Sequence, residues 1–231
     1  MTRLAVIGAG KMGRLVAALA PEMGFELVAT LGSERTRSGI TRDALAGADV
    51  AIEFTVPSAA AGVVRACAAA GVPVVSGTTG WDAERAIVEA EVRGSSGALL
   101  WAPNFAIGVH LFSKVVAEAA RRFEKVRVGF DVHLLETHHA QKLDAPSGTA
   151  RLLANVAERA GGRAVPITSV RTGHVPGTHE IVFDAPFEQV RLVHEARDRR
   201  VFAAGALTAA RWLVGRRGVF TLDDFLGEIA R

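Results

Sequence analysis

The sequence has one cysteine, no long apolar run and no block of basic residues, and each absence excludes a class of protein. Cys67 is the single cysteine among 231 residues, so the chain cannot form an internal disulfide, which fits a reducing cytosol. No apolar stretch approaches the roughly 20 residues that a membrane span needs. The apolar run that follows Met1 is too short for a signal peptide. We therefore expect a cytoplasmic protein that does not bind membranes.

The composition is that of an ordinary globular protein and gives no sign of a nucleic-acid partner. The chain has 49% hydrophobic and 22% charged residues, with a net charge of +3. Its basic residues do not form the clustered stripe that nucleic-acid binding requires. The seven histidines lack cysteine partners and a helical HExxH arrangement, and the adjacent His138 and His139 point apart in an extended chain. We predict neither nucleic-acid binding nor a metal site.

The N-terminal segment has the pattern of a dinucleotide-binding turn. A short apolar run at 4–7 leads into a GxGxxG motif at 8–13, and helix-forming residues follow. In this motif the first glycine makes the tight turn, the second admits the pyrophosphate and the third lets helix and strand pack closely. The predicted cofactor contacts are Gly8, Gly10, Lys11, Met12 and Gly13. The alternative is a glycine-rich strand-to-helix turn without a ligand.

The end of the second predicted strand, at 26–30, bears on the choice of cofactor. A fold that prefers NAD usually carries an acidic residue there, which binds the ribose hydroxyls. This chain instead has Ser33, Arg35 and Arg37, which can hold a 2′-phosphate. We predict NADPH, with NADH as the alternative because Glu34 lies in the same segment. The competing interpretation is a solvated, flexible loop.

Strand and helix patterns alternate through the remainder of the first hundred residues. Further strands are predicted at 50–55, 72–75 and 98–101, with helices at 57–70 and 81–92. These strands are mostly apolar and do not alternate with polar residues, which predicts a parallel sheet covered on both faces. Ligands of such sheets bind outside the carboxyl ends of the strands.

The second part of the chain predicts a smaller α+β domain. Helices are expected at 104–123 and 149–160, and strands at 126–135, 167–171, 180–183 and 189–194. The strands form an open mixed sheet with helices on one face. An exposed apolar sheet face usually meets another subunit.

The last part of the chain is predicted to return to the first domain through a helix at 199–215 and a segment at 219–229. The expected fold class is α/β. A Rossmann-type dinucleotide-binding domain comprises 1–104 and 200–231, and a substrate-binding and oligomerisation domain comprises 105–199, with hinges near Phe105 and Arg199.

The segment from Glu136 to Ala150 concentrates the chemistry of the chain. His138 can transfer a proton near neutral pH, and Lys142 is a fixed cation with three donors. A Pro-Ser-Gly-Thr turn then begins a helix, and a helix N-terminus attracts anions. Together these groups favour a carboxylate or a phosphate as the ligand. The alternative is an ordinary helix start beside solvated histidines.

The pattern of this segment resembles the signature of the dihydrodipicolinate reductases of bacterial lysine and diaminopimelate biosynthesis. Two upstream positions depart from it, with His133 and Leu134 where an acidic and a β-branched residue are usual. The glycine turn is also one residue shorter than is common in the family, with Lys11 in the basic position. Weaker resemblances extend over nearly the whole chain.

The resemblance implies reduction of 4-hydroxy-tetrahydrodipicolinate to tetrahydrodipicolinate by a homotetramer. His138 is the expected general acid, assisted by Lys142. The expected substrate-binding residues are His139, Lys142, Ser147, Gly148, Thr149 and Arg171. The cofactor is expected to contact Ser33 and Arg35, with its nicotinamide held by Phe54, Gly77, Thr78, Thr79, Ala102, Asn104 and Phe105. Domain closure would bring the nicotinamide to the substrate.

Two other functions remain open from the residues themselves. An amino-acid or aspartate dehydrogenase of the same two-domain plan would share the glycine motif, without a reason to carry Pro-Ser-Gly-Thr after the histidines. A non-catalytic nucleotide sensor would keep the glycines without the histidines and Lys142. The other histidines considered, His174, His179 and His194, are expected at the surface or satisfied within the sheet.

Overall fold

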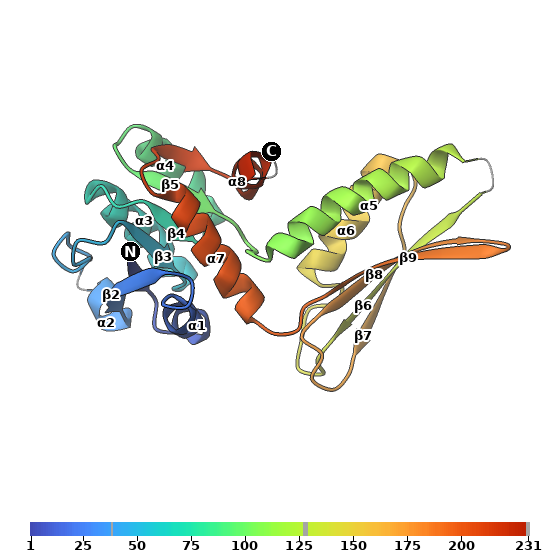
Figure 1. The fold of residues 1–231 in the computed structure, drawn as a ribbon, viewed down its shortest axis with the longest axis horizontal. Helices are drawn as coiled ribbons and strands as arrows, with labels where there is room; N and C mark the ends of the chain where they lie inside the picture. Colours follow the sequence, from blue (N-terminus) through green and yellow to red (C-terminus); the bar gives the residue numbers. More distant parts are fainter. Residues whose placement is uncertain (38, 127–128, 230–231) are drawn as a thin grey trace. The chain divides into compact units, whose positions relative to one another are not determined.

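The computed structural model describes residues 1–37, 39–126 and 129–229. The chain divides into two compact units: Met1–Phe105 with Phe202–Arg231, and Ala106–Val201. Each unit has its own sheet among the described residues (Figure 1). The first has six strands in the order β10-β5-β4-β3-β1-β2, and the second has four in the order β7-β6-β8-β9. The predicted α/β class is confirmed.

The first unit is a parallel sheet with helices on both faces. Its elements are β1 (Thr2–Ile7), α1 (Lys11–Leu19), β2 (Phe25–Leu31), α2 (Ser33–Arg37), β3 (Val50–Glu53), α3 (Pro57–Ala69), β4 (Val74–Ser76), α4 (Asp82–Arg93), β5 (Ala98–Trp101), α7 (Arg200–Leu213), β10 (Gly218–Phe220) and α8 (Leu222–Ile229). Every strand pair is parallel. Four successive residues of β1, from Leu4 to Ile7, are fully buried, which requires cover on both faces.

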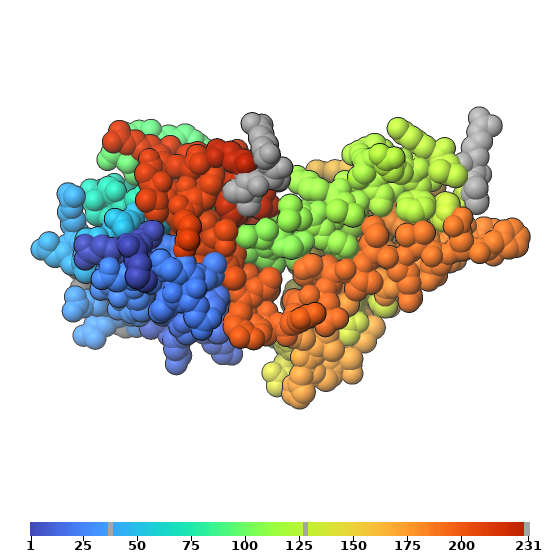
Figure 2. All heavy atoms as spheres, in the orientation of Figure 1, coloured from blue at the N-terminus to red at the C-terminus, as the bar shows by residue number. Residues whose placement is uncertain are grey.

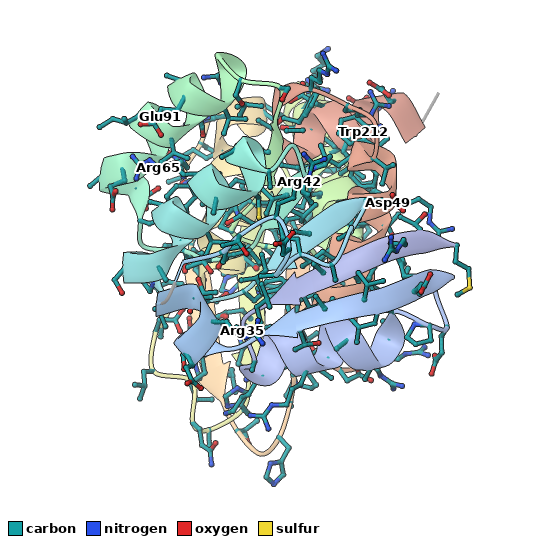
Figure 3. The ribbon with its side chains drawn as sticks, turned by 90° about the vertical axis from the view of Figure 1, so that its left-hand side faces the viewer. Arg35, Arg42, Asp49, Arg65, Glu91 and Trp212 are labelled. Atoms are coloured by element: carbon teal, nitrogen blue, oxygen red, sulfur yellow. The ribbon has the colours of Figure 1, made fainter. Side chains whose placement is uncertain are left out.

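The helices of the first unit supply that cover from the two sides of the sheet. α3 and α4 pack their alanines and valines, with buried Cys67, against alternate residues of β1, β3 and β4. Arg65 on α3 pairs with Glu84 and Glu91 on α4 at 3.3 and 2.6 Å, which ties the two helices together (Figure 3). α1 and α7 lie toward the other face (Figure 1). The carboxyl ends of the strands are therefore left for the loops.

Beyond boundary shifts of one or two residues, such as the end of β3 at Glu53 rather than at 55, two parts of the first unit differ from the sequence-based expectation. The segment after β2 is a short helix, α2, where the alternative prediction was a flexible loop. The side chain of Arg37 lies outside the described residues. The sheet also gains a sixth strand, β10, which pairs with β5 through Gly218–Phe220. This segment has only three residues and no alternation of apolar and polar side chains, which is too little to predict a strand.

The second unit is a mixed sheet with two helices on one face. Its elements are α5 (Ile107–Lys125), β6 (Asp131–His138), α6 (Gly148–Gly161), β7 (Ile167–Arg171), β8 (Thr178–Ala185) and β9 (Glu188–Glu195). β6 pairs with β7 in parallel and with β8 antiparallel, and β8 pairs with β9 antiparallel. α5 and α6 lie side by side over the sheet (Figure 1). Their apolar stripes meet the inward residues Val132, Leu134, Ile181 and Phe183.

Several boundaries in this unit were predicted wrongly. β6 begins at Asp131 rather than at 126, because Gly129 has φ +77°, which a continuous strand does not allow. Residues 127 and 128 of that predicted strand lie outside the described residues. α5 begins at Ile107 rather than at 104, because Ala106 is still extended. β8 and β9 each extend beyond their predicted ends.

The outer face of the second sheet carries apolar side chains among polar ones. Val170 and Val193 are 36% and 54% exposed, and Phe187, at the turn between β8 and β9, is fully exposed. The β8–β9 hairpin forms the uncovered orange end of the unit in Figure 2. A hollow of about 420 Å³ on this sheet includes Leu135 and Val182 among its lining residues. Among the described residues, no helix is both long and apolar enough to cross a membrane.

Candidate active site

The three glycines of the β1–α1 turn have different surroundings. Gly8 has φ +109°, and a Cβ there would overlap the carbonyl of Phe54. A Cβ on Gly13 would overlap the carbonyl of Gly8, so the third glycine is required for α1 to approach β1. Gly10 has open space around it and is the N-cap of α1, without a side-chain capping bond. The backbone amides of the first turn of α1 therefore suit an anion approaching at Gly10.

A cavity of about 440 Å³ adjoins this turn at the carboxyl ends of β1, β3 and β4. It is lined by seven of the predicted cofactor residues, Gly10, Lys11, Met12, Phe54, Gly77, Thr78 and Thr79, together with Thr55 and Pro57, which were not predicted. Phe54 meets buried Phe105 edge to face, with ring centroids 6.3 Å apart. A Cβ on Gly77 would overlap the Phe54 ring. Ala102, Asn104 and Phe105 do not line this cavity.

A buried carboxylate, Glu53, joins the ends of β3 and β4 beneath this cavity. It is fully buried and accepts hydrogen bonds from Ser76 Oγ at 2.6 Å, Thr78 Oγ1 at 2.5 Å and the Thr55 N–H at 2.6 Å. Because these donors come from both strand ends, Glu53 fixes the two loops against each other. The sequence signal was a single acid at the end of an apolar strand.

One of the predicted 2′-phosphate residues, Ser33, lines a second cavity of the same unit. This cavity, of about 540 Å³, is lined by Ser33 and Thr36 of α2 and by residues that include Val56, Ser58 and Ala59 at the start of α3. Arg35 is exposed on α2 and does not line it (Figure 3). Each residue of the segment from Phe54 to Ser58 lines one cavity or the other, so the two cavities lie next to each other along this segment.

In the second unit, His138 is the last residue of β6 and is 7% exposed. Its Nδ1 lies 2.7 Å from Oε2 of Glu136, which is two residues earlier on the same face of the strand. The ring of His179, from β8, meets the His138 ring edge to face at 5.1 Å. The prediction placed both histidines at a strand end. His139 begins the loop and is half-buried.

Glu136 is the centre of a buried polar cluster. Its Oε1 accepts hydrogen bonds from Arg171 Nη2 at 2.7 Å and from the Ser147 N–H at 3.1 Å. Strand register explains the first contact, since Glu136 and His138 of β6 lie beside Ser169 and Arg171 of β7. Burial by itself raises the pKa of Glu136, but the surrounding donors outweigh it and lower that pKa to about 2. The carboxylate is therefore charged at neutral pH.

Both histidines of the cluster are shifted toward the neutral form. Burial lowers the pKa of His138, with Lys142 and Arg171 adding to the effect and Glu136 opposing it. Burial, and then the neighbouring His138, lower the pKa of His179 to about 4. His179 is 4% exposed, and its Nε2 lies 3.1 Å from Ser147 Oγ. Without a bound ligand, both rings are therefore neutral at pH 7.

Positive groups surround the loop that follows His138. Lys142 Nζ pairs with Asp144 Oδ1 at 2.7 Å, and its side chain is 23% exposed. Arg171 also donates to the Asp144 carbonyl at 2.6 Å, which fixes the loop to β7. The loop is further tied by the Thr172 N–H, which donates to the His138 carbonyl at 2.9 Å.

The predicted anion site at the start of α6 has an ordered cap. Ser147 is the N-cap, its Oγ accepts from the Ala150 N–H at 3.1 Å, and the residue is 2% exposed. The hydroxyl and the N–H of Ser147 are thus both used within the protein. Gly148 is exposed, with open space where a side chain would be. Thr149 is half-buried in the first turn.

Sequence reasoning did not include His179 or Glu136 in the site. His179 precedes Ile181 and Phe183 at a spacing of two, so a strand predicted from 178 rather than 180 would have placed it on the inward face. Glu136 lies opposite His179 in the β6–β8 register, which no local pattern reveals. Of the other two histidines, His174 is exposed, as expected, and His194 meets Phe112 with ring centroids 5.9 Å apart.

The same cluster is a group of described residues that could hold a metal ion. Glu136, His138 and His179 each offer one ligating atom, and these atoms lie within 4.8 Å of one another. Arg171 already pairs with the carboxylate at 2.7 Å, and this cation opposes a second positive charge at the same group. The pairing with Arg171 therefore favours a charge-paired cluster over a cation site.

Solved structures identify the general class of this fold. A dipicolinate-bound dihydrodipicolinate reductase from Paenisporosarcina sp. TG-14 covers 96% of this chain and 98% of its own, with a TM-score of 0.77 and 23% identity. An aspartate dehydrogenase from Thermotoga maritima covers 94% and 98%, with a TM-score of 0.52 and 12% identity. The chain therefore shares the fold of these two enzymes, a Rossmann-type unit with a second sheet.

Sequence comparison then gives the family. The family models described as dihydrodipicolinate reductase, N-terminus, and dihydrodipicolinate reductase, C-terminus, match residues 2–105 and 108–226. A 4-hydroxy-tetrahydrodipicolinate reductase from Thiobacillus denitrificans is 37% identical over 97% of this chain and 98% of the relative. One from Christiangramia forsetii is 31% identical over 98% of each. The chain belongs to the dihydrodipicolinate reductase family and is an oxidoreductase, which confirms the resemblance.

Proposed function

We propose that the chain reduces 4-hydroxy-tetrahydrodipicolinate to tetrahydrodipicolinate with NADPH, in lysine and diaminopimelate biosynthesis. The observation that carries the proposal is the cluster around His138. A nearly buried imidazole lies between a charged carboxylate and two cations, Lys142 and Arg171. This arrangement suits proton transfer to an anionic substrate.

The first unit supplies the nucleotide site in this proposal. The open space at Gly10 and the start of α1 receive the pyrophosphate, and the adjoining 440 Å³ cavity supports the nicotinamide half. The proposed nicotinamide contacts are Phe54, Gly77, Thr78, Thr79, Ala102, Asn104 and Phe105. Ser33 and Arg35 on α2 bind the 2′-phosphate, and NADH is the alternative cofactor. Residues 1–104 and 200–231 then form the dinucleotide-binding domain.

The second unit supplies the substrate site, within residues 105–199. Two carboxylates of the substrate are held by His139, Lys142, Gly148, Thr149 and Arg171. Lys142 is already paired with Asp144, so a substrate carboxylate must displace or share that partner. Ser147 contributes by fixing the loop through its bonds to Glu136 and His179.

The chemistry requires a hydride from the nicotinamide and a proton from the protein. Loss of the 4-hydroxyl group as water would leave a conjugated ring, and hydride addition to that ring would then leave an electron-rich centre, which takes a proton from His138. His138 is neutral in the ligand-free protein because burial and two cations lower its pKa. A bound dicarboxylate adds negative charge beside the ring and raises that pKa. Substrate binding thus favours the protonated form of His138, and His138 then donates this proton to the substrate.

The outer face of the second sheet is the proposed contact between subunits. Its partly apolar surface and the 420 Å³ hollow offer area for burial against a second copy. A homotetramer formed through such sheets is proposed on the strength of the family resemblance.

A coupled assay tests the reductase activity. Aspartate semialdehyde and pyruvate are condensed enzymatically, and oxidation of NADPH or NADH is followed after the purified chain is added. We expect oxidation that depends on both precursors, and a fall of roughly two orders of magnitude or more in His138→Gln. Oxidation with a 2-oxo acid and ammonia, but not with the condensation product, would instead favour the amino-acid dehydrogenase alternative.

A further inference from the structure

We propose that Glu136 is a positioning residue for His138, which keeps the imidazole proton on Nδ1 and so leaves Nε2 as the atom that exchanges a proton with substrate. The inference rests on the proposed function, because it assigns the atom of His138 that acts. Glu136 itself reaches no substrate, since its side chain is fully buried.

The carboxylate is held in a fixed orientation by its other contacts. Arg171 Nη2 and the Ser147 N–H both donate to Oε1, at 2.7 and 3.1 Å. With that oxygen committed, Oε2 lies 2.7 Å from His138 Nδ1, an ion-pair distance at which the present ring orientation does not complete a hydrogen bond. Since an ionised carboxylate accepts hydrogen bonds but cannot donate, it favours the ring tautomer that carries its proton on Nδ1.

The opposite edge of the ring is left accessible by a glycine. A Cβ on Gly177 would come within 3.0 Å of His138 Nε2, so a side chain there would crowd this atom. Gly177 has φ +156° and immediately precedes β8. The absence of a side chain at this position keeps Nε2 available to a ligand.

The titratable groups that face His138 come from three strands and one loop, and those that are charged act in opposite directions. Glu136 on β6 raises the pKa of His138, whereas burial, Lys142 in the loop and Arg171 on β7 lower it. His179 on β8 is neutral at pH 7 and packs against the ring. Among these neighbours, Glu136 is the group that favours the imidazolium form.

The substitution Glu136→Gln separates positioning from simple packing. The two donors that hold Oε1 will hold the amide oxygen of glutamine in the same place, so the amide NH2 will face His138 Nδ1. An NH2 group can donate to Nδ1 but not accept from it, so the neutral ring changes to the tautomer protonated on Nε2. The NH2 group also opposes the imidazolium form, which needs an acceptor at Nδ1.

The experiment combines nitrogen NMR of the histidine side chains with steady-state kinetics. We expect the His138 signals, assigned with His138→Gln, to change from the Nδ1-protonated to the Nε2-protonated pattern in Glu136→Gln. We expect kcat to fall about 100-fold while KM changes by less than about threefold. The basic limb of the kcat/KM profile should move to lower pH in Glu136→Gln and to higher pH in Lys142→Ala.

Two further variants control for damage to the fold. Glu124→Gln neutralises another carboxylate of this unit that pairs with an arginine, Arg163, and should leave the His138 signals and kcat unchanged. Glu136→Asp keeps the charge, so it should retain the Nδ1-protonated pattern and recover part of kcat, even if the glutamine variant does not fold.

An unchanged tautomer in folded Glu136→Gln, or an Nε2-protonated ring in the wild type, overturns the positioning role. A wild type without reductase activity would defeat the proposed function instead, while the tautomer measurement would still decide the structural claim.

Discussion

The buried His179 should make the protein lose stability as the pH falls from 7.5 to 5. Its pKa is about 4 in the folded chain, against an ordinary value of 6.5. A group whose pKa is lower in the folded chain than in the unfolded chain binds a proton more readily in the unfolded chain. The stability that neutral His179 permits is therefore present above pH 6.5 and declines as the pH falls toward 4.

The magnitude follows from these two values. Integrating the difference in bound protons between pH 7.5 and pH 5 gives a loss of about 2 kcal/mol from this residue. His138, whose pKa is also lowered, acts in the same direction. Glu136, with a pKa of about 2, contributes its own loss mainly below pH 4.5, outside this window.

Urea unfolding at a series of pH values, at one protein concentration, measures this effect. His179→Gln removes the titrating ring while its amide can still meet Ser147, so the dependence on pH should become shallower. His174→Gln, at an exposed position of the same unit, should leave the dependence unchanged. Equal slopes for the wild type and His179→Gln would refute the argument that burial keeps this ring neutral.

Two further predictions concern the ligands. Lys142→Ala should raise KM for the substrate about tenfold, because a charged hydrogen bond to a substrate carboxylate is lost. The effect is limited because Lys142 already pairs with Asp144 in the free protein. An unchanged KM would show that Lys142 does not bind the substrate carboxylate. Arg35→Ala should raise KM for NADPH about tenfold and leave KM for NADH nearly unchanged, because the exposed guanidinium is assigned to the 2′-phosphate; equal effects on both nucleotides in steady-state assays would contradict that assignment.

Much of the fold was predictable because it follows from local patterns. The apolar strands and the glycine turn at 8–13 predicted the covered parallel sheet, and four residues of β1 are indeed fully buried in succession. β7 has the predicted bounds, 167–171. β10 was missed because three residues carry no period, and its pairing with β5 depends on the distant return of the chain.

The candidate site was predictable where its residues are adjacent in sequence. The sequence pattern of the segment from Glu136 to Ala150 indicated His138 and Lys142. The partners of His138 depend instead on register, which brings Arg171 beside it from β7 and His179 opposite Glu136 from β8. Strand register is set by burial of whole faces, so it cannot be read from one strand alone.

A crystal structure with NADPH and pyridine-2,6-dicarboxylate will show whether a dicarboxylate binds beside His138. We expect the inhibitor's carboxylates to contact Lys142 and the start of α6 at Gly148 and Thr149, with its ring within reach of His138 Nε2 and the nicotinamide. Clear density for the inhibitor at another place, with this loop empty, would contradict this expectation.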